Sequence, residues 1–417
     1  MASSLLLPFA SSRSVNKRSV SSKEYVLPSI CEDFQLKSMP NRSISKLHPC
    51  CMVRSSISFS NMKKILVSLN HPAHYHLFKN TVAILRQRGY EPLYVISNKD
   101  ILERLMIAEN VEYIKLNEQI RRKKSMLSVF WGAGIDLLRK DYLLFCFVRK
   151  YRPSIMIGTD ISITHIGKLR NIPTLFFNED DFEINKLACM FAYPFVTKVV
   201  SPDICSVGKY TRKKIAYKGY QKIAYLHPDY FSPDYELIKG IVGKDESFFI
   251  IRLVSLTAGH DLTGQHNGIS MFLLDNLIDI LSRYGRIFIT SETVLDAKYN
   301  RYVLKMEPNL MHHLLSFATL FIGDSQSMCF EAGLLGTPYI RYNDFVGKIS
   351  VLNEVEHTYK LGVGIPTDNP SRLLNVIEEL LSTPDLKSVW REKVKQVYKD
   401  KIDVAKFYAD VIENEIK

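Results

Sequence analysis

The stretch at positions 323–338 has the residue types of a phosphate-binding turn. Gly323, Asp324 and Ser325 follow the short apolar run 320–322, and apolar residues then recur at spacings of three and four. This pattern predicts a strand, a tight turn and a helix. Gly323 permits the turn, and Asp324 or Ser325 can cap the helix. The first N–H groups of that helix would point into the crevice beyond the strand, where a diphosphate fits.

A carboxylate two turns into the same helix extends the predicted site. If the helix start holds a diphosphate, Glu331 could accept hydrogen bonds from the ribose hydroxyls. The alternative is an ordinary strand–helix–strand unit with a capped helix, and the pattern alone does not separate the two.

Three histidines lie in the loop after another predicted strand, residues 64–69. They are His71, His74 and His76, and they precede a predicted helix. Ligands bind at the carboxyl ends of strands in doubly wound sheets. A loop without a paired carboxylate is a weak zinc signal, so no metal site is predicted. Hydrogen bonding to a substrate, His74 as a general base, and purely structural histidines all remain open.

Acidic residues follow two more predicted strands. Asp160 comes after the buried run 155–157, and Glu179 lies in an Asn-Glu-Asp-Asp segment after 174–177. Such residues at strand ends suit catalytic acids, but they equally suit helix caps and solvated turns. Asp160 and Glu179 are the preferred functional candidates.

The composition is that of a soluble globular protein, apart from an atypical N-terminal segment. The chain has 417 residues, 46% of them hydrophobic, and its longest apolar runs are broken by Arg or Lys. Residues 1–61 are Ser-rich and carry eight Lys or Arg against three Asp or Glu. This resembles a cleavable targeting peptide and favours a plastid location. Alternatively, it is an upstream extension before a start at Met62, which would leave the protein cytoplasmic.

The formal net charge of +12 limits the class of partner. A mildly basic body suits an anionic ligand or peripheral contact with a membrane surface. No recognition motif for nucleic acid accompanies the charge. No apolar run is long enough for a transmembrane helix.

The order of predicted elements indicates two similar halves facing a central cleft. We expect residues 62–230 to form an N-terminal Rossmann-like, doubly wound domain. A second such domain is expected at 231–390. Residues 391–417 would form a C-terminal helix that crosses back, and 1–61 a disordered extension.

Several segments of the body, from residue 62 onward, resemble the family called domain of unknown function 354, within the GT-B superfamily of glycosyltransferases and UDP-N-acetylglucosamine 2-epimerases. The matching segments are 70–79, 252–255 with Ala258, His260 and Asp261, 289–292, 322–328, 343–347 and 349–350.

The resemblance implies a GT-B-like fold with a nucleotide sugar between its halves. It makes residues 62–230 the acceptor side and residues 231–390 the nucleotide-sugar side. It places the diphosphate at Ser325 and its neighbours, and the ribose at Glu331. It assigns the phosphate or sugar to the loop from Ser255 to His260. The complete set of implied donor-binding residues is Ser255, His260, Asp261, Ser291, Glu292, Gly323, Asp324, Ser325, Gln326, Ser327 and Glu331. His71 and His76 would belong to the acceptor-side loop.

Comparison with the epimerases shows one similarity and two departures. Asp160 and Glu179 occupy places comparable to those of epimerase residues that handle the sugar proton. However, residues 258–261 replace the epimerase His-Arg-x-Glu-Asn segment, and 325–327 replace its Ser-Gly-Gly turn.

The predicted function is therefore metal-independent glycosyl transfer from a nucleoside diphosphate sugar to a sugar or lipid-linked acceptor, with no further cofactor. His74 or Asp160 would be the base. The alternatives are an epimerase or hydrolase that uses Asp160 and Glu179 as an acid/base pair, and a noncatalytic nucleotide-sugar-binding protein.

Overall fold

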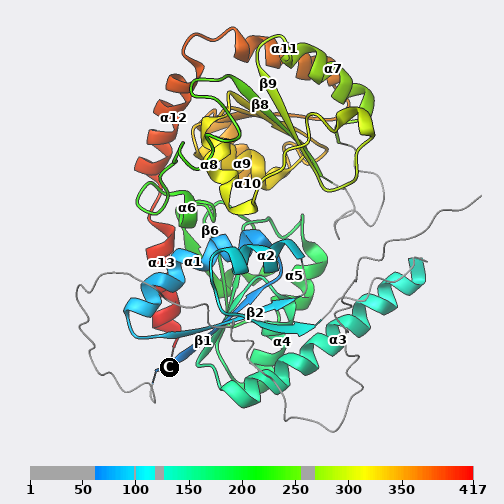
Figure 1. The fold of residues 1–417 in the computed structure, drawn as a ribbon. Coiled ribbons are helices and arrows are strands. Elements are labelled where there is room, and N and C mark those ends of the chain that lie inside the picture. The colour runs from blue at the N-terminus through cyan, green and yellow to red at the C-terminus, as the bar shows by residue number, and fades with distance from the viewer. Residues whose placement is uncertain (1–61, 98–99, 118–125, 255–267, 417) are drawn as a thin grey trace, which may run out of the picture. The chain divides into compact units, whose positions relative to one another are not determined.

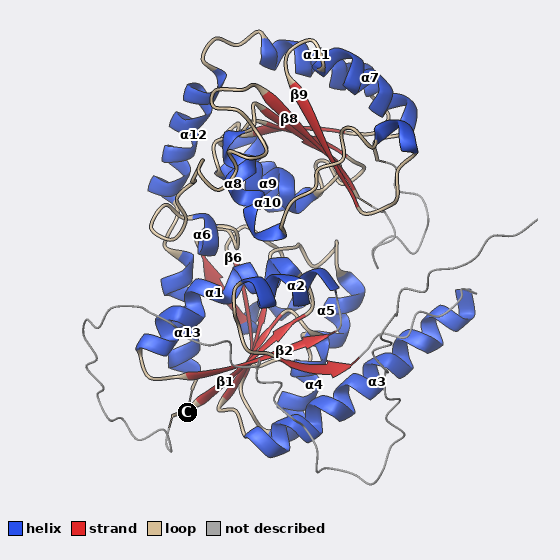
Figure 2. Cartoon of the chain, in the orientation of Figure 1, coloured by secondary structure: helices blue, strands red, loops and turns tan. Residues whose placement is uncertain are grey.

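The computed structural model describes residues 62–97, 100–117, 126–254 and 268–416 (Figure 1). All of them belong to one compact unit. The predicted targeting extension at 1–61 lies outside the described residues. Two parallel sheets, each flanked by helices, make up the fold (Figure 2).

The first sheet has seven parallel strands in the order β3-β2-β1-β4-β5-β6-β7. They are β1 (Lys64–Leu69), β2 (Glu91–Ser97), β3 (Ile114–Asn117), β4 (Ile155–Gly158), β5 (Thr174–Phe177), β6 (Lys198–Pro202) and β7 (Lys214–Tyr217). β7 lies at the edge of this sheet and pairs with β6 in parallel. The strand order reverses between β1 and β4, which is the topological switch point where ligands bind in such sheets.

Helices cover both faces of the first sheet. They are α1 (Pro72–Gln87), α2 (Asp100–Ala108), α3 (Met126–Tyr151), α4 (Ile161–Arg170), α5 (Lys186–Ala192), the short helix η2 (Gly208–Lys213) and α6 (Ile223–Leu226). Alternate residues of β1 enter different cores. Ile65 and Val67 join the cluster that contains α1, whereas Leu66 joins the cluster of α3 and α4. A parallel sheet buried on both faces accounts for the continuous apolar runs of its strands.

The second sheet has five parallel strands in the order β12-β11-β10-β8-β9. They are β8 (Phe248–Leu253), β9 (Arg286–Ser291), β10 (Leu320–Gly323), β11 (Tyr339–Tyr342) and β12 (Gly362–Ile365). Here the switch point lies between β8 and β10. The prediction of two doubly wound α/β domains is confirmed.

The helices of the second half surround this sheet and continue to the end of the chain. They are α7 (Met271–Leu281), η3 (Ala297–Tyr299), η4 (Pro308–Leu310), α8 (Met311–Phe317), α9 (Gln326–Leu334), α10 (Ser350–Asn353), η5 (Glu354–Thr358), α11 (Pro370–Leu381), α12 (Leu386–Asp400) and α13 (Val404–Glu415). The last helix, α13, packs on α1. Thr81 Oγ1 donates a hydrogen bond to the Ala405 carbonyl at 3.3 Å, and the hydroxyls of Tyr217 and Tyr408 lie 2.6 Å apart. Across the described ranges, no helix combines the length and apolar character needed to cross a bilayer.

Candidate functional site

The start of α9 lies at the switch point of the second sheet and can receive an anion. Ser325 is the N-cap of the helix, and its hydroxyl accepts a hydrogen bond from the Met328 N–H at 3.4 Å. Within the described part of the chain, the N–H groups of Gln326 and Ser327 have no hydrogen-bond partner. Ser327 is exposed and Gln326 half-buried. Two accessible N–H donors therefore point outward from the positive end of the helix dipole.

Asp324 ties the turn before this helix to the end of β8. Its Oδ1 accepts a hydrogen bond from the Val254 N–H at 2.8 Å, and its carbonyl accepts one from Asn343 Nδ2 at 2.9 Å. A Cβ on Gly323 would lie 2.9 Å from the Arg252 carbonyl, so only glycine allows β8 and β10 to approach this closely. Burial raises the pKa of the Asp324 carboxyl to about 6. Asp324 thus shapes the turn rather than offering a free carboxylate.

The raised pKa of Asp324 predicts a pH-dependent effect of Asp324→Asn on stability. A raised folded-state pKa means that the folded protein holds the proton more tightly than the unfolded chain does. This contribution to stability is complete below pH 3.8 and is lost as the pH rises through about 6. At pH 7.5 we expect the variant to be more stable than wild type by about 3 kcal/mol, since the pKa rises by about two units and one pKa unit is worth about 1.4 kcal/mol.

Urea denaturation from pH 4.5 to 7.5 measures the effect. The advantage of Asp324→Asn should shrink steadily as the pH falls. The exposed Asp368 provides the matched control, because Asp368→Asn removes a carboxylate from the same domain without burial. An advantage that does not change with pH would contradict the assignment.

A cation and a carboxylate lie beside the same switch point. Arg252, in β8, donates from Nη2 to Glu292 Oε1 at 2.7 Å, and its buried Nε has no partner among the described residues. The Ser291 and Thr293 hydroxyls are 3.2 Å apart at the end of β9. Ser255, His260 and Asp261, which were also predicted to bind the donor, lie outside the described residues.

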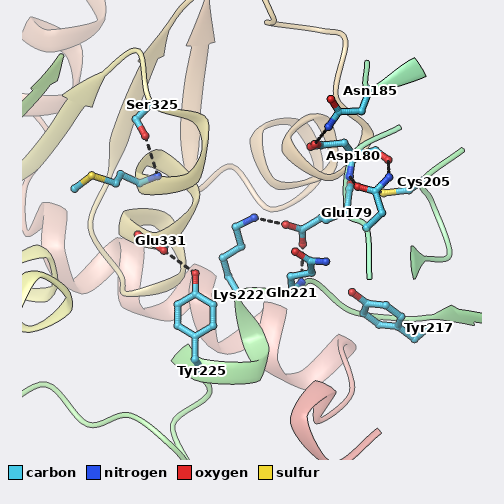
Figure 3. Close-up of polar contacts among 12 residues, drawn as sticks. Glu179, Asp180, Asn185, Cys205, Tyr217, Gln221, Lys222, Tyr225, Ser325 and Glu331 are labelled. Atoms are coloured by element: carbon cyan, nitrogen blue, oxygen red, sulfur yellow. Dashed lines mark hydrogen bonds and ion pairs between the residues drawn. The ribbon is translucent and has the colours of Figure 1, made fainter. Parts of the chain in front are cut away.

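Glu331 lies in α9 but is buried, at 7% exposure. Figure 3 shows its carboxylate directed toward Tyr225, whose hydroxyl donates to it at 2.6 Å. His312 Nε2 is 3.5 Å away. Burial raises the pKa of Glu331, but the attraction and hydrogen bond of His312 and the hydrogen bond of Tyr225 outweigh it, so the net pKa is lowered. The predicted contact of Glu331 with a ribose stays a prediction.

Asp160 anchors the switch point of the first sheet. It caps α4, its Oδ1 accepting from the Ser162 N–H at 3.2 Å. Its Oδ2 accepts from Ser68 Oγ at 2.8 Å and pairs with Lys140 Nζ at 2.7 Å. Burial raises the pKa of Asp160, but the Lys140 charge and these hydrogen bonds outweigh it, and the net pKa is lowered. A carboxylate held in this way is a poor base.

His74 lies next to Asp160 in the same loop cluster. It is half-buried, and its Nδ1 accepts a hydrogen bond from the Asn70 N–H at 3.3 Å. The Thr159 hydroxyl is 3.0 and 3.1 Å from its two ring nitrogens. Lys140 Nζ donates to Asn70 Oδ1 at 2.9 Å. The first switch point therefore combines an imidazole, a hydroxyl and a paired lysine.

The other two loop histidines have different surroundings. His71 is exposed and caps α1 by accepting from the Ala73 N–H at 3.2 Å. His76 is buried against Tyr225 and His312, and burial lowers its pKa well below the usual value. No group of three or more His, Cys, Asp or Glu placed to hold a metal ion occurs among the residues that the structure describes.

Glu179, after β5, forms a buried ion pair. Its carboxylate contacts Lys222 Nζ and accepts from the Gln221 N–H at 2.6 Å (Figure 3). Burial lowers the pKa of Lys222, but the charge and hydrogen bond of Glu179 outweigh it and the net pKa is raised. The Lys222 ammonium also lies 5.2 Å from the centre of the Phe330 ring in α9. The pair thus connects the carboxyl end of β5 with α9.

The sequence analysis missed three charged residues at these edges. Lys140 and Lys222 have no pattern that marks them, because each meets its carboxylate only in the folded chain. Arg252 could have been found, because it is the lone cation inside the apolar strand β8. It appeared only within the segment 252–255 that resembles the family.

The fold is similar to solved structures of UDP-sugar epimerases and glycosyltransferases. UDP-GlcNAc 2-epimerase from Neisseria meningitidis, bound to UDP-GlcNAc, is 11% identical over 84% of this chain and 99% of its own, with a TM-score of 0.55. S. aureus MnaA, solved with UDP, is 11% identical over 85% and 96%, with a TM-score of 0.58. A glycosyltransferase of Streptomyces sp. SF2575 is 10% identical over 84% and 99%, with a TM-score of 0.54.

At these identities the similarity establishes a GT-B-like fold, as predicted. A scan against protein-family models and a search of curated proteins found no match. Membership of the family called domain of unknown function 354 therefore stays a prediction.

Proposed function

We propose that the protein is a glycosyltransferase that uses a nucleoside diphosphate sugar. The accessible start of α9 is the observation that carries this proposal. The N–H groups of Gln326 and Ser327, which have no partner among the described residues, lie at the positive end of a helix dipole, at the switch point where Arg252 also lies. Such groups stabilise the charge that develops on a leaving diphosphate.

The reaction requires one bond to form as another breaks. The oxygen of the acceptor hydroxyl bonds to the anomeric carbon of the sugar. The bond from that carbon to the diphosphate breaks, and its electron pair leaves with the nucleotide. The hydroxyl proton passes to a base on the acceptor side. We assign that base to His74 rather than Asp160, because three groups already hold the Asp160 carboxylate and its pKa is lowered.

The remaining predicted residues have places in this proposal. Gly323, Ser325, Gln326 and Ser327 would surround the diphosphate. Glu331 would exchange its contact with Tyr225 for a ribose hydroxyl. Plastid targeting by residues 1–61, and a sugar or lipid-linked acceptor, belong to the same proposal.

Adding a negative charge at the helix start tests the donor site. Ser327 is the second residue of α9, where aspartate favours the helix dipole but would repel a diphosphate. We expect Ser327→Asp to keep or raise stability by about 0.3–1 kcal/mol. Its affinity for the preferred nucleotide sugar should fall about 10- to 100-fold, as Coulomb repulsion of about 1–3 kcal/mol requires.

Ser371→Asp provides a closely matched control. Ser371 is exposed and is also the second residue of its helix, α11. The full chain is titrated with UDP-, dTDP-, GDP- and ADP-sugars, and both thermal shift and nucleotide release are followed. Wild type and Ser371→Asp should bind one donor class equally. Equal binding by Ser327→Asp would remove α9 from the donor site, and no binding of any donor would overturn the proposed function.

A further inference from the structure

Two helices of the first half expose large apolar side chains at helical spacing. On α3, Ile135, Leu138 and Tyr142 are separated by three and four residues and all are more than half exposed. This spacing places them on one face of the helix. On α5, the exposed residues at the same spacings are Leu187, Met190 and Phe191. Exposed apolar residues that gather in this way indicate a binding surface.

His165 of α4 bridges α3 and α5, the two helices that carry these faces. Its Nδ1 lies 2.8 Å from Asp141 Oδ2 on α3, and its Nε2 lies 3.0 Å from the Phe191 carbonyl on α5. Asp141 is one turn from Leu138, and Leu169, 68% exposed, is one turn from His165. Figure 1 shows α3, α4 and α5 in the same half, and α4 packs against both of the others. We define the α3–α5 patch as Leu138, Tyr142, Leu169, Met190 and Phe191.

Basic side chains accompany the patch on the same helices. The exposed bases are Arg139, Arg149, Lys150, Lys168, Arg170 and Lys186. Within the described side chains of α3, α4 and α5, Asp136 is the one exposed acidic residue, so the positive charges are in excess. This surface therefore combines apolar area with an excess of positive charge.

We propose that the α3–α5 patch docks on the surface of an anionic lipid bilayer. Apolar side chains on an amphipathic face enter the boundary between headgroups and acyl chains, while Lys and Arg meet anionic headgroups. A second copy of this chain would instead bring the same excess of positive charge against itself, which disfavours association. The chemistry of the patch thus selects a membrane over a self-interface.

The location of the patch relates it to the first switch point. Lys140, two residues from Leu138, lies on a different side of α3 and contacts Asp160 and Asn70. Docking through α3 would hold the predicted acceptor-side loop near the lipid surface. This last step rests on the proposed function, whereas the docking itself does not.

Vesicle sedimentation with the full chain, without any nucleotide sugar, tests the docking. The vesicles are pure phosphatidylcholine or an equimolar mixture with phosphatidylglycerol. The variant Leu138→Glu/Phe191→Glu places two charges in the patch at exposed positions, where folding should tolerate them. Phe272→Glu is the control, because Phe272 is 77% exposed on α7 of the other half.

We expect wild type and Phe272→Glu to sediment with the anionic vesicles and only weakly with neutral ones. Leu138→Glu/Phe191→Glu should lose about tenfold or more in vesicle affinity, and Lys168→Glu/Arg170→Glu should lose mainly the preference for anionic lipid. No sedimentation of wild type, or an equal loss in Phe272→Glu, would overturn the proposal. So would a dimer in light scattering that Leu138→Glu/Phe191→Glu dissociates. Because no donor is present, none of these results depends on the proposed function.

Discussion

Arg341→Met is expected to lower the free energy of unfolding of the second half by about 3–5 kcal/mol, because it leaves a buried carboxylate without its partner. Arg341 is fully buried in β11. Its Nε and Nη2 donate to the two Glu356 oxygens at 2.8 and 2.9 Å. Burial lowers the pKa of Arg341, but the hydrogen bonds and charge of Glu356 outweigh it, and the net pKa is raised.

The pair of Arg341 and Glu356 also supports the turn before α9. Arg341 Nη1 donates to Asn343 Oδ1 at 3.2 Å, and Asn343 Nδ2 donates to the Asp324 carbonyl at 2.9 Å. A chain of hydrogen bonds thus runs from the buried pair to the residue before the α9 N-cap. Loss of Arg341 should therefore loosen that turn as well as the core.

Urea unfolding followed by Trp390 fluorescence, in a Trp131→Phe background, measures the effect. Trp390 is buried in the core of the second half, where its Nε1 donates to the Leu361 carbonyl at 2.6 Å. Arg341→Met/Glu356→Leu should recover most of the stability, because it removes both charges. Arg372→Met breaks an exposed pair with Glu379 and should change stability by less than about 1 kcal/mol. A loss of that small size in Arg341→Met would show that water or another group compensates Glu356.

Sequence patterns predicted the central strands because burial on both faces leaves a continuous apolar signal. The predicted strands 64–69 and 174–177 match β1 and β5 residue for residue. Two of the edge strands gave a weaker signal. β7 has half-buried and exposed positions next to a basic run, and β12 contains two glycines. Neither has enough buried apolar residues to stand out from the surrounding loops.

The candidate site divides in the same way between local and distant contacts. The cap of α9 could be predicted because Ser325 and Met328 are three residues apart. Asp160 and Ser68 are 92 residues apart, and Glu331 and Tyr225 are 106 apart. Such contacts depend on strand order and packing, which periodicity does not encode. The carboxylates can therefore be predicted from the sequence, but the groups that hold them cannot.

The ion pair of Glu179 and Lys222 provides the second large effect and separates the two enzymatic interpretations. Lys222→Met should lower the free energy of unfolding by about 3–5 kcal/mol, because the buried Glu179 carboxylate would keep, among the described residues, only the hydrogen bond from the Gln221 N–H. Glu179→Leu/Lys222→Met should recover most of this loss, since both charges are then absent. The exposed pair of Lys239 and Glu236 supplies the control, and Lys239→Met should change stability by less than about 1 kcal/mol.

Activity of the double variant decides what Glu179 does. In the proposed glycosyl transfer, Glu179 holds Lys222 beside α9 and takes no proton from the sugar. The stable double variant should then still release nucleotide from the donor. In an epimerase, Glu179 would exchange the proton on the sugar carbon, so the double variant would lose all turnover despite its stability. Deuterium uptake from heavy water into the sugar of the wild-type reaction, followed by mass spectrometry, checks the same point independently. Uptake that disappears in Glu179→Leu/Lys222→Met would place acid/base chemistry at the pair of Glu179 and Lys222 and replace transfer by epimerisation.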